Sequence, residues 1–144
     1  MWEYLYLAAT AWLLGYVPFF EIYLAIPAVM MMGFDPVSAV IWGGLGNFMA
    51  VPTILFFHKQ LAKVPRLGKW LHSLENNRFR SHIEKYGATM VVVLTVVAGV
   101  WAMAAIGRVL GLSRLKLSLS CALSIVLYSI LTAYAVQAGL DWFL

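Results

Sequence analysis

The sequence predicts an all-α integral membrane protein, an inverted repeat with about three spanning helices, two re-entrant hairpins and a cytoplasmic amphipathic helix. Its hydrophobic fraction is 63%, whereas ordinary globular chains have roughly 45–50%. Its charged fraction is 11%, against roughly 25% in such chains. With 144 residues the chain forms a single membrane domain. This composition excludes a soluble enzyme, a disordered tail and, with one cysteine, a disulfide-stapled secreted module.

The charged residues divide the chain into five uncharged stretches around one hydrophilic connection. These stretches are 4–20, 22–34, 36–58, 86–107 and 117–140. A spanning helix needs roughly 20 apolar residues, and 36–58 and 117–140 meet this length. Stretch 4–20 meets it together with the aromatic residues at its start, which are typical of a membrane interface. These three stretches are therefore the predicted spanning helices.

Stretch 22–34 is too short to span, because thirteen helical residues cover only about 20 Å of a core about 30 Å thick. Joined to the preceding stretch it would be too long, and Pro18, Glu21 and Pro27 would interrupt the helix. We expect a re-entrant hairpin over about 18–34, whose broken backbone is covered by protein or by a watery cavity.

Residues 59–85 form the hydrophilic loop between a first half, 1–58, and a second half, 86–144. Seven of the ten basic residues lie in this loop, and cytoplasmic loops carry an excess of Lys and Arg. The loop and the N-terminus are therefore expected in the cytoplasm. Apolar residues at helical spacing after Pro65, which suits the first helical position, predict a basic amphipathic helix on the inner membrane surface. A solvated linker is the alternative.

Four bases of this loop are predicted to contact anionic lipid, because the loop adjoins the membrane. They are Lys59, Lys63, Arg66 and Lys69. No nucleic-acid partner is expected. The three histidines are spaced by 14 and 10 residues, which is not the spacing of helical metal ligands. We therefore expect no metal, and no motif for another cofactor is present.

Charge placement also predicts the path of 86–107. If this stretch crossed the membrane, Arg108, Arg114 and Lys116 would lie outside, against the positive-inside rule. A second re-entrant hairpin, centred near Ala98-Gly99, keeps all ten bases in the cytoplasm. Only 117–140 then crosses in the second half, and the C-terminus lies outside.

An internal repeat supports two equivalent halves. Residues 32–37 align with 110–115 at an offset of 78. In each segment a glycine ends a hairpin, a capping residue (Asp35 or Ser113) follows, and a long apolar helix begins. On this topology one junction lies outside and the other inside, which makes the repeat inverted, as in many secondary transporters.

Three polar residues in the apolar stretches are candidates for a pathway. Glu21 is the acid inside the apolar first half, where a charged carboxylate is costly; it is a proton-coupling or cation-binding residue, or an interfacial glutamate. Arg108 is a pathway or anion-binding residue, or an arginine that snorkels to the interface. Asn47 bonds across helices or faces substrate. Beside it, Ala39, Gly43 and Gly46 form a face suited to close helix packing, within the subunit or across a dimer.

Short motifs in this order resemble the small multidrug-export membrane family, which is distantly similar in architecture to the DedA superfamily of lipid-carrier translocases. The resemblance covers about 15–140, and the motifs are 21–27 (EIYLAIP), 45–47 (LGN) with 51–52 (VP), 84–87 (EKYG) and 98–101 (AGVW). It implies that the hairpin residues Pro27 and Trp101 belong to the pathway as well. The chain departs from the family at Tyr23, where a basic residue is typical, and at 96–99, where Pro-x-Pro-Gly is typical.

The resulting hypothesis is a small secondary transporter in the inner (plasma) membrane, not an enzyme, that exports small amphipathic or ionic compounds. The two hairpin tips would form its site, with Glu21 coupling protonation to movement. One alternative is a translocase of polyprenyl-phosphate or phospholipid carriers, in which Arg108 and the basic loop engage the phosphate. Another is a non-transporting scaffold or assembly subunit. The few helices of one copy favour a homodimer.

Overall fold

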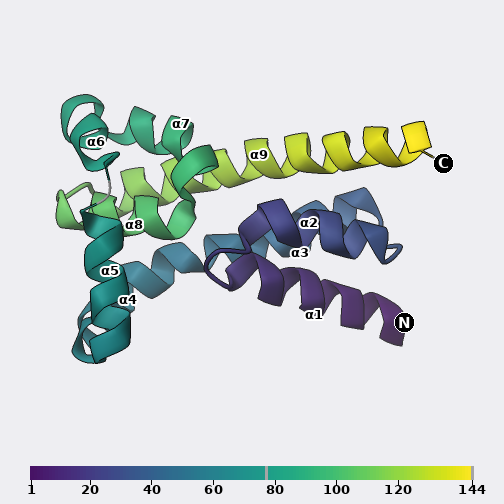
Figure 1. The fold of residues 1–144 in the computed structure, drawn as a ribbon, viewed down its shortest axis with the longest axis horizontal. Coiled ribbons are helices and arrows are strands. Elements are labelled where there is room, and N and C mark those ends of the chain that lie inside the picture. The colour runs from purple at the N-terminus through teal and green to yellow at the C-terminus, as the bar shows by residue number, and fades with distance from the viewer. Residues whose placement is uncertain (77, 144) are drawn as a thin grey trace. The chain divides into compact units, whose positions relative to one another are not determined.

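The computed structural model describes residues 1–76 and 78–143, and regular structure in this part of the chain is helical (Figure 1). Its helices are α1 (Trp2–Tyr16), α2 (Glu21–Met31), α3 (Pro36–Phe48), α4 (Ala50–Lys63), α5 (Pro65–Glu75), α6 (Arg80–Tyr86), α7 (Ala88–Ala98), α8 (Val100–Val109) and α9 (Arg114–Phe143). The predicted all-α fold class is confirmed.

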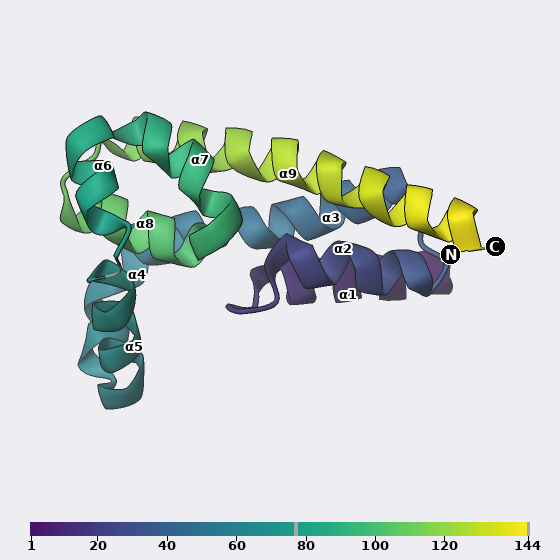
Figure 2. The same ribbon diagram turned by 45° about the horizontal axis from the view of Figure 1, so that its top comes forward.

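The helices form two compact units. Unit 1 comprises residues up to Met49 together with α9 from Ile125 onward, and unit 2 comprises Ala50–Ser124. In unit 1, α1, α2 and α3 pack against one another, side by side in both ribbon views (Figures 1 and 2). In unit 2, α8 packs against α4, α5 and α7.

Among the residues that the structure describes, two helices are long and apolar enough to cross a membrane: Pro36–Lys63, which joins α3 and α4, and Arg114–Trp142 in α9. The helix Pro36–Lys63 continues beyond its predicted end at residue 58. Its end is set by the extended Val64 before Pro65 and not by the first charged residue, Lys59. Within it a turn at Met49 separates α3 from α4, where Pro52 cannot donate the helical hydrogen bond to the carbonyl four residues earlier.

The third predicted span is shorter than expected. Helix α1 has 15 residues, which is about 22 Å of helix. It is followed by a four-residue turn and by α2, which has 11 residues and covers about 16 Å. The chain thus folds back where the first hairpin is predicted, but the break comes before Glu21 rather than in the middle of 18–34.

Gly99 separates α7 from α8 at the predicted tip of the second hairpin. Its φ is +86°, a left-handed conformation that glycine adopts without the clash of a Cβ atom. The two helices on either side pack against each other. Stretch 86–107 is therefore two short helices rather than one long one.

The junctions before α3 and α9 share one hydrogen-bond pattern. Gly33 and Gly111 have φ of +95° and +76°, as in helix C-termini that end on a left-handed residue. The first equivalent pair of hydrogen bonds ends the preceding helix: Phe34 N–H donates to Val29 O (2.9 Å), and Leu112 N–H donates to Gly107 O (3.0 Å). The second pair caps the following helix: Ser38 N–H donates to the Asp35 carboxylate (2.8 Å), and Lys116 N–H donates to the Ser113 hydroxyl (3.2 Å). In both pairs the corresponding donors and acceptors are 78 residues apart. The predicted glycine and cap are thus present in both segments.

The offset extends over the helices that flank these junctions. Helices α2 and α8 occupy equivalent positions, as do the joined α3 and α4 and the whole of α9. Unit 1 contains α2 and the part of α9 from Ile125 onward, whereas unit 2 contains α8 and α4. Each unit therefore combines the short helix that precedes one long helix with the end of the other long helix.

The two caps are expected to respond differently to acid. The hydrogen bond from Ser38 N–H lowers the pKa of the exposed Asp35 carboxyl below its ordinary value of 3.8. The stabilisation from this cap is therefore fully present above pH 3.8. It is lost as the pH falls through the lower pKa that Asp35 has in the folded protein. The Ser113 cap does not titrate. Replacing Asp35 with Ala should cost about 1 kcal/mol at pH 7.

Unfolding temperatures measured between pH 6 and 3 check this expectation. Asp35→Asn keeps a cap without a titrating group, and its stability should fall less on acidification than that of the wild type. An identical acid response of the two proteins would contradict the role of Asp35 as a charged cap.

Candidate functional site

Glycines bring α1 and α3 into close contact in unit 1. A Cβ atom on Gly46 would lie 2.0 Å from the Trp12 carbonyl oxygen, and one on Gly15 would lie 2.3 Å from the Gly43 oxygen. Ala39 on the same face is fully buried. The predicted small-residue face therefore packs within the subunit, which is one of the two arrangements expected for it.

The contacts of Gly43 fix the register between α2 and α3. A Cβ atom on Gly43 would meet Ile26 at 3.3 Å and Ala25 at 3.9 Å. The chain reverses direction at the short junction between α2 and α3, so the two helices are antiparallel. One turn towards the end of α3 therefore corresponds to one turn towards the start of α2. We therefore infer that Asn47 faces the turn of α2 that contains Glu21.

Glu21 is a buried acid on a strained stretch of backbone. Its exposure is 7%, and its φ is +49°, while Phe19 two residues earlier has φ of +77°. Left-handed conformations cost residues with a side chain about 1–2 kcal/mol each. Backbone strain of this kind is concentrated at functional sites in proteins. Gly99, its equivalent at the 78-residue offset, is also left-handed.

Three buried oxygens in unit 1 have no hydrogen-bond partner among the described residues. They are the Tyr23 hydroxyl, Asn47 Oδ1 and the Ser129 hydroxyl. Asn47 and Ser129 are 1% and 0% exposed, and buried polar atoms in proteins are paired with protein groups or with ordered water. We refer to Glu21, Tyr23, Asn47 and Ser129 together as the polar core of unit 1.

The contacts of this polar core link α2, α3 and α9. Tyr23 interacts electrostatically with Glu21 and with Tyr128 on α9. A Cβ atom on Gly44 would lie 3.6 Å from the Ser129 hydroxyl and 3.5 Å from Ile125. One turn of α3 separates Gly44 from Asn47. The polar core thus contains groups from three helices, α2, α3 and α9.

Charge is divided between the two units. All ten Lys and Arg residues and the three His residues are in unit 2, with two acids, so the formal net charge of unit 2 is +8. Unit 1 contains the other four acids and no Lys, Arg or His, which gives −4. Glu21 is the one acid of unit 1 that is buried among the described residues, and the unit itself supplies no Lys, Arg or His to balance it.

The five predicted pathway residues are distributed over the two units. Glu21, the half-buried Pro27 and Asn47 lie in unit 1. Trp101 and Arg108 lie on α8 in unit 2, where Trp101 is buried and its ring is 5.5 Å from that of Trp70. This ring contact joins α5 to α8.

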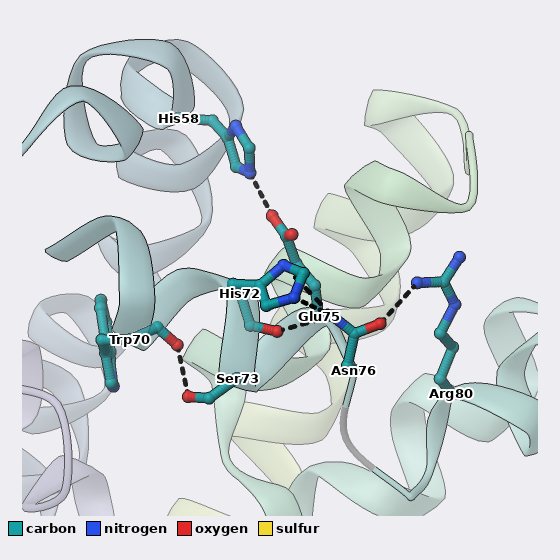
Figure 3. Close-up of polar contacts among 7 residues, drawn as sticks. All are labelled: His58, Trp70, His72, Ser73, Glu75, Asn76 and Arg80. Carbon is teal, nitrogen blue, oxygen red and sulfur yellow. Dashed lines mark hydrogen bonds and ion pairs between the residues drawn. The ribbon is translucent and has the colours of Figure 1, made fainter. Parts of the chain in front are cut away.

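A His–Glu pair in unit 2 was not predicted from the sequence. His58 on α4 contacts the Glu75 carboxylate on α5, and both side chains are largely buried (Figure 3). Next to it, Asn76 donates to the His72 carbonyl (2.9 Å) and accepts from Arg80 (3.4 Å). The described residues contain no group of three potential metal ligands. The His58–Glu75 contact joins α4 to α5.

The bases predicted to contact lipid are exposed on α4 and α5 of unit 2: Lys59, Lys63, Arg66 and Lys69. The Arg114 guanidinium, at the start of α9, lies 5.4 Å from the Phe56 ring on α4. This contact brings the start of α9 next to the middle of α4, the helix that leads into the basic loop.

Comparison with known protein families identifies a family that matches most of the chain. The model of a family described as "Putative small multi-drug export protein" matches residues 21–131, which include Glu21, Asn47, Trp101 and Ser129. No curated protein and no solved structure matches the chain.

Proposed function

The chain belongs to the small multi-drug export protein family, and on this premise we propose that it is a secondary transporter that exports small amphipathic or ionic compounds in exchange for protons. The polar core of unit 1 is the coupling site, and Glu21 is the group that takes up and releases the proton. The chemistry is transport rather than catalysis.

One observation carries this proposal: a buried carboxyl group lies in a unit that contains four acids and no basic residue. A charged carboxylate at membrane depth is costly, and a proton or a bound cation lowers this cost. Proton binding to Glu21 then competes with cation binding at the same group. Exchange of a proton for a cationic amphiphile requires this competition.

The hairpins and the repeat support an alternating-access mechanism. We propose that both hairpins re-enter the membrane and that the two halves are inverted, because the same junction precedes both long helices. Broken helices that line a cavity are typical of such transporters. Movement of one repeat against the other would expose Glu21 to each side in turn.

The proposed topology places Ser113 in the cytoplasm with the loop 59–85. It is supported by the contact of Arg114 with Phe56 on α4, the helix that leads into this loop, and by the positive-inside rule. The N-terminus is then cytoplasmic and the C-terminus external, in the inner membrane. An exposed cysteine at position 113, in a Cys121→Ser background, should react only with a reagent that crosses the membrane.

Met32→Cys is the matched control, because Met32 is exposed in the equivalent junction and should react with an impermeant reagent from outside. Labelling of position 113 from outside would show that 86–107 spans the membrane instead. Labelling of both positions from the same side would contradict the inverted repeat.

A second candidate function is translocation of lipid-linked phosphates. It is favoured by the charge of +8 in unit 2 and by the exposed bases of α4 and α5, which suit anionic headgroups. In this function Arg108 would contact the phosphate. A homodimer, if it forms, uses a surface other than Ala39, Gly43 and Gly46, since these are buried within one chain.

An efflux assay tests the proposed export function and separates it from the alternatives. Cells that express the chain are loaded with a cationic, a neutral or an anionic amphipathic dye. We expect lower accumulation of the cationic dye, because unit 1 is negative, and recovery of accumulation when the proton gradient is dissipated. Equal accumulation of all three dyes with and without the chain would contradict export and favour the lipid-phosphate function or a scaffold.

A further inference from the structure

The polar core contains more oxygen atoms than a single coupling carboxyl needs. Besides Glu21 it holds the hydroxyls of Tyr23 and Ser129 and the Asn47 amide oxygen, none of the three with a partner among the described residues. An unpaired buried polar atom costs free energy unless water satisfies it. Buried water typically makes about three hydrogen bonds to such atoms.

Gly44 leaves room for water beside Ser129. A Cβ atom built on Gly44 would make ordinary contacts, at 3.6 Å to the Ser129 hydroxyl and 3.5 Å to Ile125. A space of about methyl size therefore adjoins a hydroxyl that is fully buried. Gly46 differs, since a Cβ atom there would strike the Trp12 backbone at 2.0 Å.

Helix geometry indicates the order of these groups. Ser129 lies next to Gly44, and Asn47 is one turn, or about 5 Å, further along α3. The contacts of Gly43 with Ile26 and Ala25 indicate that the first turn of α2, which contains Glu21, faces Asn47. Tyr23 is under the electrostatic influence of Glu21 and of Tyr128 on α9. One or two water molecules can bridge a gap of one helical turn.

The chemistry of these groups suits proton transfer. Hydroxyl groups and water both donate and accept hydrogen bonds, whereas the Asn47 amide oxygen only accepts and can hold a water molecule in place. A proton that arrives at one oxygen is passed on as another O–H bond breaks, and it finally forms an O–H bond on the Glu21 carboxylate. Only O–H bonds are made and broken, so no oxidant or reductant is needed.

We propose that Ser129, Tyr23 and Asn47 hold a short chain of buried water molecules that conducts protons to Glu21. The proposal rests on the proposed function, because it assumes that Glu21 is the group that is protonated. It assigns a role in proton supply to the second half of α9. It also gives Gly44 a role as the residue that leaves space for water.

The test follows protonation of Glu21 in the purified full-length chain. The infrared band of the protonated Glu21 carboxyl group is identified as the band that the wild type shows and Glu21→Gln lacks. Its appearance is monitored after a rapid fall in pH. Gly44→Ala fills the space and Ser129→Ala removes the hydroxyl, and each should slow the appearance of the band about tenfold or more, with the final amplitude unchanged. Ser129→Thr keeps a hydroxyl and should restore most of the rate.

Gly139→Ala is the control, because a Cβ atom there meets nothing within 4 Å. Equal rates in Gly44→Ala, Ser129→Ala and Gly139→Ala would overturn the water chain, while Glu21-dependent dye export would still stand. A wild-type rate of Glu21 protonation in Gly44→Ala would by itself overturn the water chain, because this variant removes only the space for water and retains every polar group. Absence of Glu21-dependent export would instead refute the proposed function.

Discussion

Glu21→Gln is expected to abolish transport driven by a pH gradient while leaving the protein folded in the membrane. Glutamine has nearly the same shape and can still form hydrogen bonds, but it cannot exchange a proton. The buried position of Glu21 on its strained turn would therefore be preserved. Reconstituted in proteoliposomes, the variant should show dye uptake at the background rate under an imposed pH gradient.

Two further variants make this expectation specific. Glu21→Asp keeps a carboxyl group on a shorter side chain and should retain part of the transport rate. Glu3→Gln removes another acid of unit 1, one exposed near the start of α1, and should transport at the wild-type rate. Transport by Glu21→Gln at the wild-type rate would contradict the coupling role and leave Glu21 as an interfacial glutamate.

Gly46→Ala is expected to prevent correct packing of unit 1. The added Cβ atom would lie 2.0 Å from the Trp12 carbonyl oxygen and under 3 Å from two further backbone atoms of Trp12, so the backbones of α1 and α3 must separate. Overpacking commonly costs about 1–3 kcal/mol, and a backbone clash belongs at the upper end of that range. The thermal unfolding temperature in detergent should fall, and the folded yield should fall with it.

Gly139→Ala again provides the matched control. It changes the same residue type within a helix, where nothing lies within 4 Å, and it should be neutral or stabilise the helix by up to about 1 kcal/mol. If Gly46→Ala melts at the same temperature as Gly139→Ala, the close contact of α1 and α3 is wrong.

The helix ends were the most predictable part of the fold, because local chemistry sets them. Gly33 and Gly111 with the caps Asp35 and Ser113 lie where the repeat predicts them, and Gly99 breaks its helix at the predicted hairpin tip. The start of α2 was less predictable. It depends on left-handed conformations at Phe19 and Glu21, which residue type does not favour.

The candidate site was predicted only in part. Glu21 and Asn47 were recognisable as polar residues in apolar stretches, but Ser129 resembles other serines of 117–140 until its packing against Gly44 is known. His58 and Glu75 are 17 residues apart on different helices, so no sequence spacing predicts their contact. The burial of a polar atom is a tertiary property, and hydropathy along the chain does not report it.

The central claim is that Glu21 exchanges its proton for a cationic substrate. Proton release measures this exchange directly, when the cationic dye exported in the efflux assay is added to the purified chain in weakly buffered detergent solution. We predict that the wild type releases protons in proportion to the dye bound and that Glu21→Gln releases none. Equal proton release by the two proteins, or dye binding to the wild type without release, would contradict the account.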